Sequence, residues 1–494
     1  MRDATSFLIV VLDGLRPDLL NAELTPNLSA FIEASCTFTE SRCVFPSATR
    51  VNAATLGTGT QPSRHGIVAN KFFDPCVFPD RLLHSGERES IQRAEQAYAG
   101  SFVTAPALGD LLAKAGKSLA VVSSGSAGTT HLVNPRARQN RQISLTLRDW
   151  AASTPDDVAA EMQRLFGPPA AAGFPNSARM RQQTTIFLEG IFPRYRPDVS
   201  LLWYNDPDHT FHHCGLGSEA AEQSLAALDE EFARLIDWAN SAAVGGPIQI
   251  VLISDHGHIT ARENIDLSSA LSSSGIGVSG NFENGNAFAG AAGYVGALHC
   301  AKPDQRAVTR FVAWLTDQPW CGLVFTAGGN GIEGGVAGTF DPELVFNDHA
   351  RSPELFFLMR ADDRPNAAGI DGSCFFAGEV PLGGSLHGGL HRREVKNLLA
   401  LSGDLFRSRA NLDAPAGIVD ILPTVLTALD LPIPEGVDGR VLHEAFLNPA
   451  GKADGEVRFQ HHVIEARHGS QHLRTARFGG SQYIVEGFLE NTGR

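Results

Sequence analysis

The feature that most constrains the fold is a series of short, uninterrupted apolar runs separated by amphipathic stretches. An apolar run without polar alternation is typical of a strand buried on both faces, and in parallel sheets such strands alternate with helices. We therefore predict an α/β fold with a mostly parallel central sheet and helices on both of its faces. The runs are residues 7–12, 119–122, 199–204, 248–253 and 355–359, and the clearest helical patterns are 220–238 and 307–315.

The chain is predicted to consist of a core and two additions. Residues 268–296 are dense in Gly, Ser and Ala, which is typical of loops. We expect residues 266–380 to form an inserted, Gly-rich and loop-rich lobe between two parts of one catalytic core, residues 1–265 and 381–450. Residues 451–494 show strand-like alternation, and we expect them to complete the core.

Charge and composition exclude several classes of protein. The 494 residues contain 54 Asp and Glu against 40 Lys and Arg, a formal net charge of −14. This balance argues against a protein that coats nucleic acid, because phosphate backbones are bound by clustered Lys and Arg. A small phosphate ester is still possible as a ligand, since a metal ion can supply a local positive site.

Targeting signals and cysteines favour a cytoplasmic protein. No apolar run reaches the roughly 18 residues of a membrane span, and the N-terminal run shows no cleavage site of a secretory signal. The seven cysteines are scattered without a CxxC pair, so we expect neither a disulfide framework nor a thiolate zinc site. The sequence does not indicate an oligomeric state.

Polar side chains follow the predicted strands, at the sheet edge where parallel sheets bind their ligands. Aspartate and histidine are ligands that zinc prefers, and an Asp–His pair four residues apart lies on one face of a helix. Three residues of each type predict two three-ligand metal sites, each with an open position for substrate. The six candidates are Asp13, Asp208, His212, Asp255, His256 and His387.

Each candidate has a simpler explanation when it is taken alone. Asp13 also fits a cap of a helix near Pro17, and Asp208 also fits a helix N-terminus. A loop histidine next to glycines, such as His387, is usually just solvated. Four further histidines lie beside the candidates, as supporting partners or as rivals in register: His209, His213, His258 and His391.

A hydroxyl nucleophile is expected in residues 43–52 (CVFPSATRVN), directly before a helix-like segment. Two metal ions about 4 Å apart suit hydrolysis at phosphorus, and coordination activates a hydroxyl nucleophile. A helix N-terminus also favours a bound phosphoryl oxygen. Ser47 and Thr49 are both candidates, and each also fits the simpler role of an N-cap.

The ordered motifs resemble the alkaline phosphatase superfamily, and more narrowly the type I phosphodiesterase/nucleotide pyrophosphatase family. The likeness covers about residues 5–445, including residues 49–52 (TRVN), 58–67 and the later Asp and His motifs. It implies two zinc sites, in which manganese or iron can replace zinc. One site is then formed by Asp13, Thr49, Asp255 and His256, and the other by Asp208, His212 and His387.

The same resemblance implies roles in catalysis. Thr49 becomes the nucleophile and forms a phosphorylated threonine that is then hydrolysed, while Asn52 donates to a non-bridging oxygen of the substrate. The register to His65 favours Thr49 over Ser47. Arg50 stands where the family often has an aromatic residue, and it either holds a charged substrate or is simply solvated.

The leading hypothesis is a two-metal hydrolase of phosphodiester or pyrophosphate bonds in a small-molecule phosphate ester. A phosphonate or phosphomonoester hydrolase is the alternative, since phosphonoacetate hydrolases resemble the same metal frame. Those enzymes hold the substrate carboxylate partly with lysines after the strand that corresponds to residues 119–122. Residues 123–129 contain no lysine, which disfavours that substrate. A sulfatase is rejected because residues 43–46 contain one residue too many for its motif, and a non-catalytic binding protein is hard to reconcile with six ligand positions.

Overall fold

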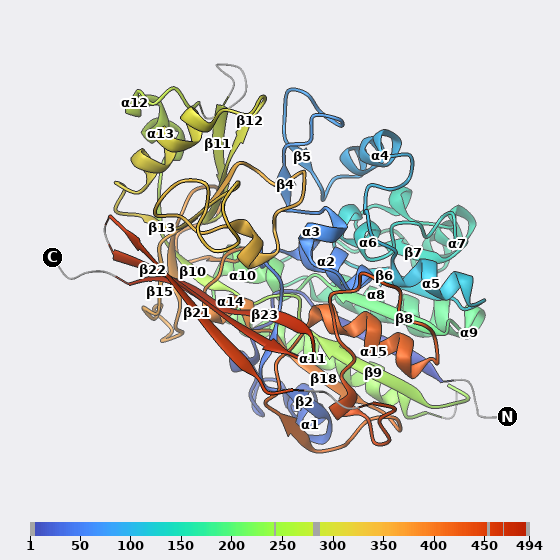
Figure 1. The fold of residues 1–494 in the computed structure, drawn as a ribbon. Helices are drawn as coiled ribbons and strands as arrows, with labels where there is room; N and C mark the ends of the chain where they lie inside the picture. Colours follow the sequence, from blue (N-terminus) through green and yellow to red (C-terminus); the bar gives the residue numbers. More distant parts are fainter. Residues whose placement is uncertain (1–4, 242–243, 280–286, 452–454, 468, 491–494) are drawn as a thin grey trace.

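The computed structural model describes residues 5–241, 244–279, 287–451, 455–467 and 469–490, which form an α/β protein around an eight-stranded sheet (Figure 1). The strands β7, β6, β8, β1 and β9 are mutually parallel, whereas β18 runs antiparallel to both of its neighbours. The sheet is therefore mostly parallel, as predicted. In spatial order its strands are β19 (Ala410–Leu412), β2 (Cys36–Phe38), β18 (Leu399–Ser402), β9 (Ile248–Ile253), β1 (Ser6–Leu12), β8 (Val199–Tyr204), β6 (Leu119–Ser123) and β7 (Ile143–Thr146).

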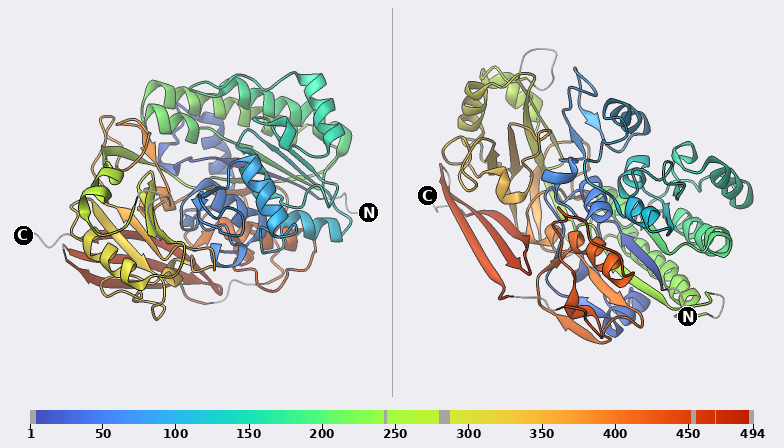
Figure 2. Two further views of the ribbon diagram at one scale, coloured as in Figure 1. Left: turned by 90° about the horizontal axis from the view of Figure 1, so that it is seen from above. Right: turned by 45° about the vertical axis from the view of Figure 1, so that its right-hand side comes forward.

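Helices cover both faces of this sheet, which explains why its strands are apolar throughout. In β1, Ile9 and Val11 belong to one buried cluster, and Val10 and Leu12 belong to another on the opposite face. Figure 2 shows the two helix layers. The first cluster includes α2 (Thr49–Thr58), α4 (Arg88–Ala97), α5 (Leu108–Lys114), α6 (Ala127–Val133) and α15 (Ile421–Ala428), and the second includes α1 (Pro26–Ala34), α7 (Asp156–Phe166), α8 (Ser177–Thr185), α9 (Phe192–Tyr195), α10 (Asp208–Cys214) and α11 (Glu219–Ala239).

Residues 266–380 contain a sheet of their own as well as loops. Residues 355–359 form a strand, as predicted, but this strand belongs to a four-stranded antiparallel sheet and not to the parallel sheet. Its run is uninterrupted because Phe357 contacts Phe311 of a helix while Phe356 contacts Phe45. The elements are α12 (Leu267–Ser274), β11 (Ala287–Ala292), β12 (Val295–Cys300), α13 (Gln305–Leu315), β13 (Cys321–Thr326) and β14 (Leu355–Met359). Residues 280–286 of the predicted Gly-rich lobe lie outside the described residues.

The C-terminal strands pack against this second sheet (Figure 1). Leu473 and Ile484 share a buried cluster with Leu323 of β13. The three strands, β21 (Arg458–Ala466), β22 (Gly469–Phe478) and β23 (Ser481–Glu490), form an antiparallel sheet. The division of the chain into a core, a lobe and a completing segment stays a prediction.

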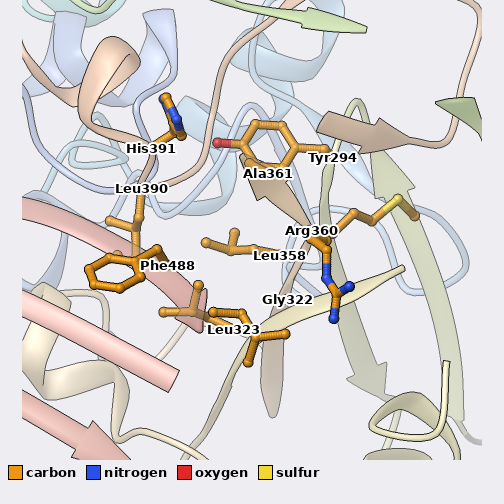
Figure 3. Close-up of a pocket in the computed structure, with 12 residues that line it drawn as sticks. Tyr294, Gly322, Leu323, Leu358, Arg360, Ala361, Leu390, His391 and Phe488 are labelled. Carbon is orange, nitrogen blue, oxygen red and sulfur yellow. The ribbon is translucent and has the colours of Figure 1, made fainter. Parts of the chain in front are cut away.

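A small cavity lies where these two sheets meet (Figure 3). Leu323, Leu358, Leu390 and Phe488 are among its lining residues. Its volume of about 10 Å³ is about that needed for one water molecule. It is therefore too small for a substrate.

The chain enters the lobe segment and returns to the core through two paired strands, which we call the neck. β10 (Ile259–Asn264) pairs with β17 (Ser385–Leu386), so that Ile259 stands opposite Leu386. The chain before this pair carries residues 255–258, and the chain after it carries His387. The shorter elements are β3 (Ser41–Arg42), α3 (Pro62–His65), β4 (Lys71–Phe72), β5 (Leu83–His84), β15 (Ala361–Asp362), β16 (Ser373–Phe376), α14 (Arg392–Val395) and β20 (Ala416–Gly417). None of the described helices has both the length and the apolar character needed to cross a membrane.

Candidate metal centre

All six predicted ligands meet at one edge of the central sheet. Asp13 follows β1, Asp208 begins α10, Asp255 and His256 follow β9, and His387 follows β17. They converge because the carboxyl ends of β1, β8 and β9 meet at this edge and the neck returns the chain to it. The structure thus brings together residues that lie more than 370 positions apart in the sequence.

One group of potential ligands is centred on Asp208. Its Oδ1 atom lies 3.2 Å from His212 Nε2, 3.4 Å from His387 Nε2 and 3.0 Å from His258 Nε2. The ligand atoms of these four residues all lie within 4.8 Å of one another. Three of them were predicted, and His258, one of the four neighbouring histidines, completes the group.

A second group contains Asp13, His256 and again Asp208, with all ligand atoms within 4.8 Å of one another. His256 Nε2 lies 3.5 Å from Asp13 Oδ1 and 3.3 Å from Asp255 Oδ2. Asp255 Oδ2 is buried and has no hydrogen-bond partner among the described residues. An unpaired carboxylate oxygen is costly to bury, so a cation at this position fits the residues present.

The charges of the cluster also fit a cation. Burial raises the pKa of Asp13 well above its usual value, and the charges of Asp255 and Asp208 raise it further. Burial likewise raises the pKa of Asp208, but His212 and His258 outweigh this effect and hold it well below the usual value. Burial and the neighbouring His256 keep the pKa of His387 well below normal. Burial lowers the pKa of His212, but the charge of Asp208 and its hydrogen bond outweigh this effect and raise it. Crowded carboxylates beside imidazoles are what a divalent ion stabilises.

Backbone groups orient the imidazoles. His387 Nδ1 lies 2.8 Å from the carbonyl oxygen of Ser47, and His212 Nδ1 lies 2.7 Å from that of Ser385. A carbonyl oxygen can only accept, so each Nδ1 carries a proton, and each Nε2 is the nitrogen that faces the cluster and could bind a metal ion. The His212 side chain is 23% exposed, whereas that of His256 is fully buried, so the cluster opens to solvent on the His212 side.

Gly14 allows the ligands to approach one another. Its φ angle is +74°, and its N–H donates to Asp255 Oδ1 at 2.9 Å. A Cβ atom at this position would lie 2.6 Å from His258 Nε2 and 2.9 Å from the Cβ of Asp208. Only glycine combines this backbone conformation with so close a contact.

Of the two candidate nucleophiles, Thr49 faces the cluster. Its Oγ1 lies 3.1 Å from His256 Nε2 and 3.4 Å from Asp13 Oδ1. The Ser47 hydroxyl is buried and engaged elsewhere, since it lies 2.8 Å from Glu394 Oε1 and accepts from the Gly388 N–H at 3.0 Å. Thr49 is also the first residue of α2, as the prediction of a helix N-terminus requires.

A buried carboxyl group supports the loop that carries the nucleophile. Glu394 accepts hydrogen bonds from Ser47 and from the Tyr294 hydroxyl of the lobe segment. Burial raises the pKa of Glu394 to about 8, despite these two donors. The carboxyl group of Glu394 is therefore neutral at pH 7. It joins the loop before α2, the lobe and the segment after His387.

The amide of Asn52 is engaged within its own loop. Asn52 is fully buried, accepts from the Val44 N–H at 3.0 Å and donates to the Ala48 carbonyl at 3.1 Å. Its predicted contact with substrate stays untested. Asn70, which the sequence reading left without a role, lies beside the nucleophile, because its Oδ1 accepts from the Arg50 N–H at 3.2 Å. No helical spacing links positions 49 and 70, so only the fold shows this neighbourhood.

The other neighbouring histidines have partners away from the cluster. His209 and His213 each lie with their ring centroid 4.7 Å from that of Phe174. His391 Nε2 lies 3.2 Å from Asp363 Oδ1. The choice of His212 over His213, made on the four-residue spacing, thus agrees with the geometry.

Comparisons with known proteins indicate the family of this chain. The model of the family described as type I phosphodiesterase / nucleotide pyrophosphatase matches residues 7–312. Human ectonucleotide pyrophosphatase/phosphodiesterase family member 5 is 23% identical over 261 residues, which are 53% of this chain and 46% of that protein. An uncharacterised pyrophosphatase/phosphodiesterase of Schizosaccharomyces pombe is 41% identical over 73 residues, 15% of each protein. The chain thus aligns with less than half the length of these curated relatives.

Solved structures show the same fold. The murine ectonucleotide pyrophosphatase/phosphodiesterase 5 superimposes with a TM-score of 0.59 at 17% identity, covering 87% of this chain and 96% of that one. Phosphonoacetate hydrolase from Sinorhizobium meliloti superimposes with a TM-score of 0.62 at 16% identity, covering 86% and 96%. With the family match over more than half of its residues, the chain belongs to the type I phosphodiesterase/nucleotide pyrophosphatase family.

Proposed function

We propose that this protein is a two-metal hydrolase of phosphodiester or pyrophosphate bonds that acts on small-molecule phosphate esters. The observation that carries the proposal is the pair of ligand groups that share Asp208 and lie beside the Thr49 hydroxyl. Zinc suits the mixed Asp and His donors, and manganese or iron also fit them. A cytoplasmic location stays a prediction.

Each ion has a set of ligands in this proposal. Asp13, Thr49, Asp255 and His256 would hold one ion, and Asp208, His212 and His387 would hold the other. When bound, the ions supply positive charge that lowers the pKa of a coordinated hydroxyl and neutralises charge on the phosphoryl oxygens. His258 lies 3.0 Å from Asp208 Oδ1 and 2.9 Å from Ser385 Oγ, so it orients the carboxylate that both groups share.

Thr49 performs the covalent step. Its Oγ1 gives its proton to solvent and bonds to phosphorus, while the bond from phosphorus to the leaving oxygen breaks and that oxygen keeps the electron pair. Water then attacks the phosphorylated threonine, breaks the Oγ1–phosphorus bond and restores the protonated hydroxyl. The position of Thr49 at the start of α2 favours the negative charge that develops on the phosphoryl oxygens.

Asn70 is better placed than Asn52 to donate to a non-bridging oxygen. Both polar atoms of the Asn52 side chain are used within residues 44–48. Asn70 Oδ1 is fixed by the Arg50 N–H, and its Nδ2 has no hydrogen bond to the described parts of the chain. We therefore assign the substrate contact to Asn70 and the support of the loop to Asn52.

A phosphonate or phosphomonoester hydrolase is the second candidate. The phosphonoacetate hydrolase with the same fold was solved in complex with phosphonoformate. An inactive murine ectonucleotide pyrophosphatase/phosphodiesterase 5 was solved in complex with AMP. The proposed metal ligands suit both substrate classes. The preference between the classes therefore depends on the residues that contact the group attached to phosphorus.

The test combines metal analysis with a substrate panel. We expect about two zinc ions per chain and turnover of bis-p-nitrophenyl phosphate above that of p-nitrophenyl phosphate and phosphonoacetate. Thr49→Ala should remove turnover while metal content stays nearly unchanged, and Thr49→Ser, which keeps a hydroxyl, should retain part of it. Substantial activity in Thr49→Ala would instead assign attack to Ser47 or water, and protein without metal would contradict the proposal.

A further inference from the structure

Arg50, the residue after the nucleophile, presents an uncommitted guanidinium group. Its Nε atom is shielded from solvent and has no hydrogen-bond partner among the described residues. The group lies against the turn that carries Gly86, where a Cβ atom would come within 3.3 Å of Arg50 Cζ. A shielded N–H donor without an acceptor is costly unless a ligand supplies one.

Arg148 brings a second guanidinium group to the same edge of the sheet. It follows β7, whose carboxyl end lies beside those of β6 and β8. Its Nη1 donates to Asn205 Oδ1 at 3.5 Å, and Asn205 follows β8 just before Asp208. In the order β9, β1, β8, β6, β7, Arg148 therefore follows the edge strand β7, on the opposite side of the metal centre from β9.

The two guanidinium groups influence each other. Burial lowers the pKa of Arg50, and the charge of Arg148 lowers it further, whereas Asp13 and Asp208 raise it. Burial and the charges of Arg50 and Lys71 lower the pKa of His84 to about 4, so this histidine beside Arg50 carries no charge at neutral pH. Both arginines therefore contribute positive charge at this point of the site.

Neither arginine has a carboxylate of its own. Within the described residues, no acidic oxygen lies within 4.0 Å of either guanidinium group. Nearby arginines are paired, as Arg88 is with Asp149 at 3.3 Å and Arg136 is with Asp110. The acidic groups that act on Arg50 are the proposed metal ligands Asp13 and Asp208, which bound cations would neutralise.

We infer that Arg50 and Arg148 form a subsite for a second anionic group of the substrate, a carboxylate or a phosphate attached close to the phosphorus that Thr49 attacks. Arginine binds either group through two parallel hydrogen bonds. Arg50 directly follows Thr49 at the start of α2, and its guanidinium group lies close enough to Asp13 and Asp208 for their charges to act on it. The inference rests on the proposed function and narrows its substrate class.

This subsite changes the argument drawn from residues 123–129. That segment has no lysine and supplies no cation to a substrate carboxylate. The structure supplies cations from two other segments, the start of α2 and the end of β7. A substrate with a carboxylate is therefore compatible with this chain.

Three p-nitrophenyl esters with the same scissile bond test the inference. They are the monoesters of methylphosphonate, phosphonoacetate and methylenebisphosphonate. The carbon bonded to the reacting phosphorus carries a hydrogen in the first, a carboxylate in the second and a second phosphonate in the third. We expect the wild type to hydrolyse at least one anionic ester with a kcat/KM about tenfold or more above that of the methyl ester. The better of the two anionic esters distinguishes a carboxylate from a phosphate as the natural group.

Arg50→Met and Arg148→Met should each lower that preference at least tenfold, mainly through KM. Arg50→Lys should keep part of it, because the charge remains. Arg138→Met is the matched control, because Arg138 is an exposed arginine paired with Asp156, and it should keep the full preference. No preference in the wild type, or an undiminished preference in both methionine variants, would overturn the inference.

Failure of the proposed function gives a different result. If neither bis-p-nitrophenyl phosphate nor any of the three esters is hydrolysed, the proposed hydrolysis is wrong. Whenever the three esters are not hydrolysed, calorimetric titration with phosphonoacetate, methylenebisphosphonate and methylphosphonate tests the subsite alone. Tighter binding of an anionic compound that Arg50→Met and Arg148→Met weaken supports the subsite. Equal binding of all three compounds refutes it.

Discussion

Replacing Gly14 by alanine tests how closely the ligands pack beside β1. The new Cβ atom would lie 2.6 Å from His258 Nε2 and 2.9 Å from the Cβ of Asp208. Both neighbours would have to move, and Asp208 is the carboxylate common to the two ligand groups. We expect a loss of folding stability together with a loss of metal binding.

The size of the stability loss follows from two separate costs. A residue other than glycine at a φ of +74° costs about 1–2 kcal/mol. Forcing an extra carbon into a closely packed site costs roughly 1–3 kcal/mol more. Gly14→Ala should therefore lower the free energy of unfolding by about 2–5 kcal/mol.

Gly116 provides a control that isolates the first cost. Its φ is +69°, yet a Cβ atom there would meet nothing within 4 Å. Gly116→Ala should lower the free energy of unfolding by only about 1–2 kcal/mol and should leave metal content unchanged. Urea unfolding of both variants after treatment with a chelator, followed by metal analysis after reloading with zinc, measures the two effects separately.

Equal destabilisation by the two substitutions would refute the packing argument. It would show that the site accommodates the extra carbon without displacing its neighbours. Normal zinc content in Gly14→Ala would likewise contradict the role given to Asp208.

The remaining predictions concern one carboxyl group and two amides. The pKa of Glu394 in the folded state is raised to about 8. The folded state therefore keeps a proton that the unfolded state releases above about pH 4.5. The free energy of unfolding of the wild type then falls by about 1.4 kcal/mol per pH unit between about pH 4.5 and pH 8. Glu394→Gln should remove this slope, and a stability difference between variant and wild type that stays constant in urea unfolding from pH 5 to 8 would contradict it. Asn52→Ala should destabilise by about 1–3 kcal/mol because it leaves the Val44 N–H unpaired, whereas Asn70→Ala should leave stability nearly unchanged and lower kcat roughly 100-fold. The opposite outcome in unfolding and kinetic assays would exchange the two roles.

Much of the central sheet was predictable because its strands are buried on both faces. The runs that became β8 and β9 match the observed strands at both ends. The same signal wrongly assigned residues 355–359 to the central sheet. These residues form β14, which is buried on both faces within the antiparallel sheet of the lobe segment. Continuous apolar character reports burial on two sides but not the sheet to which a strand belongs.

The proposed ligands were predictable where they follow strands, and less so elsewhere. Asp255 and His256 come directly after β9, and the spacing of Asp208 and His212 distinguishes His212 from His213. His258 could not be separated from the other neighbouring histidines, because the direction of its side chain depends on the turn that begins β10. Asn70 carries no local signal, since its place beside Arg50 depends on how residues 61–85 fold back over α2.

The neck at β10 and β17 has a consequence for how this enzyme class can vary. Ile259 pairs with Leu386, and Thr260 pairs with Ser385. This pairing fixes the separation between His258, which precedes β10, and His387, which follows β17. A change in the length of the segment between β10 and β17 does not alter that separation, because lengthening a closed loop costs little additional entropy. The length of the insertion can therefore change without changing this separation, provided that Tyr294, which donates to Glu394 beneath the nucleophile loop, is retained.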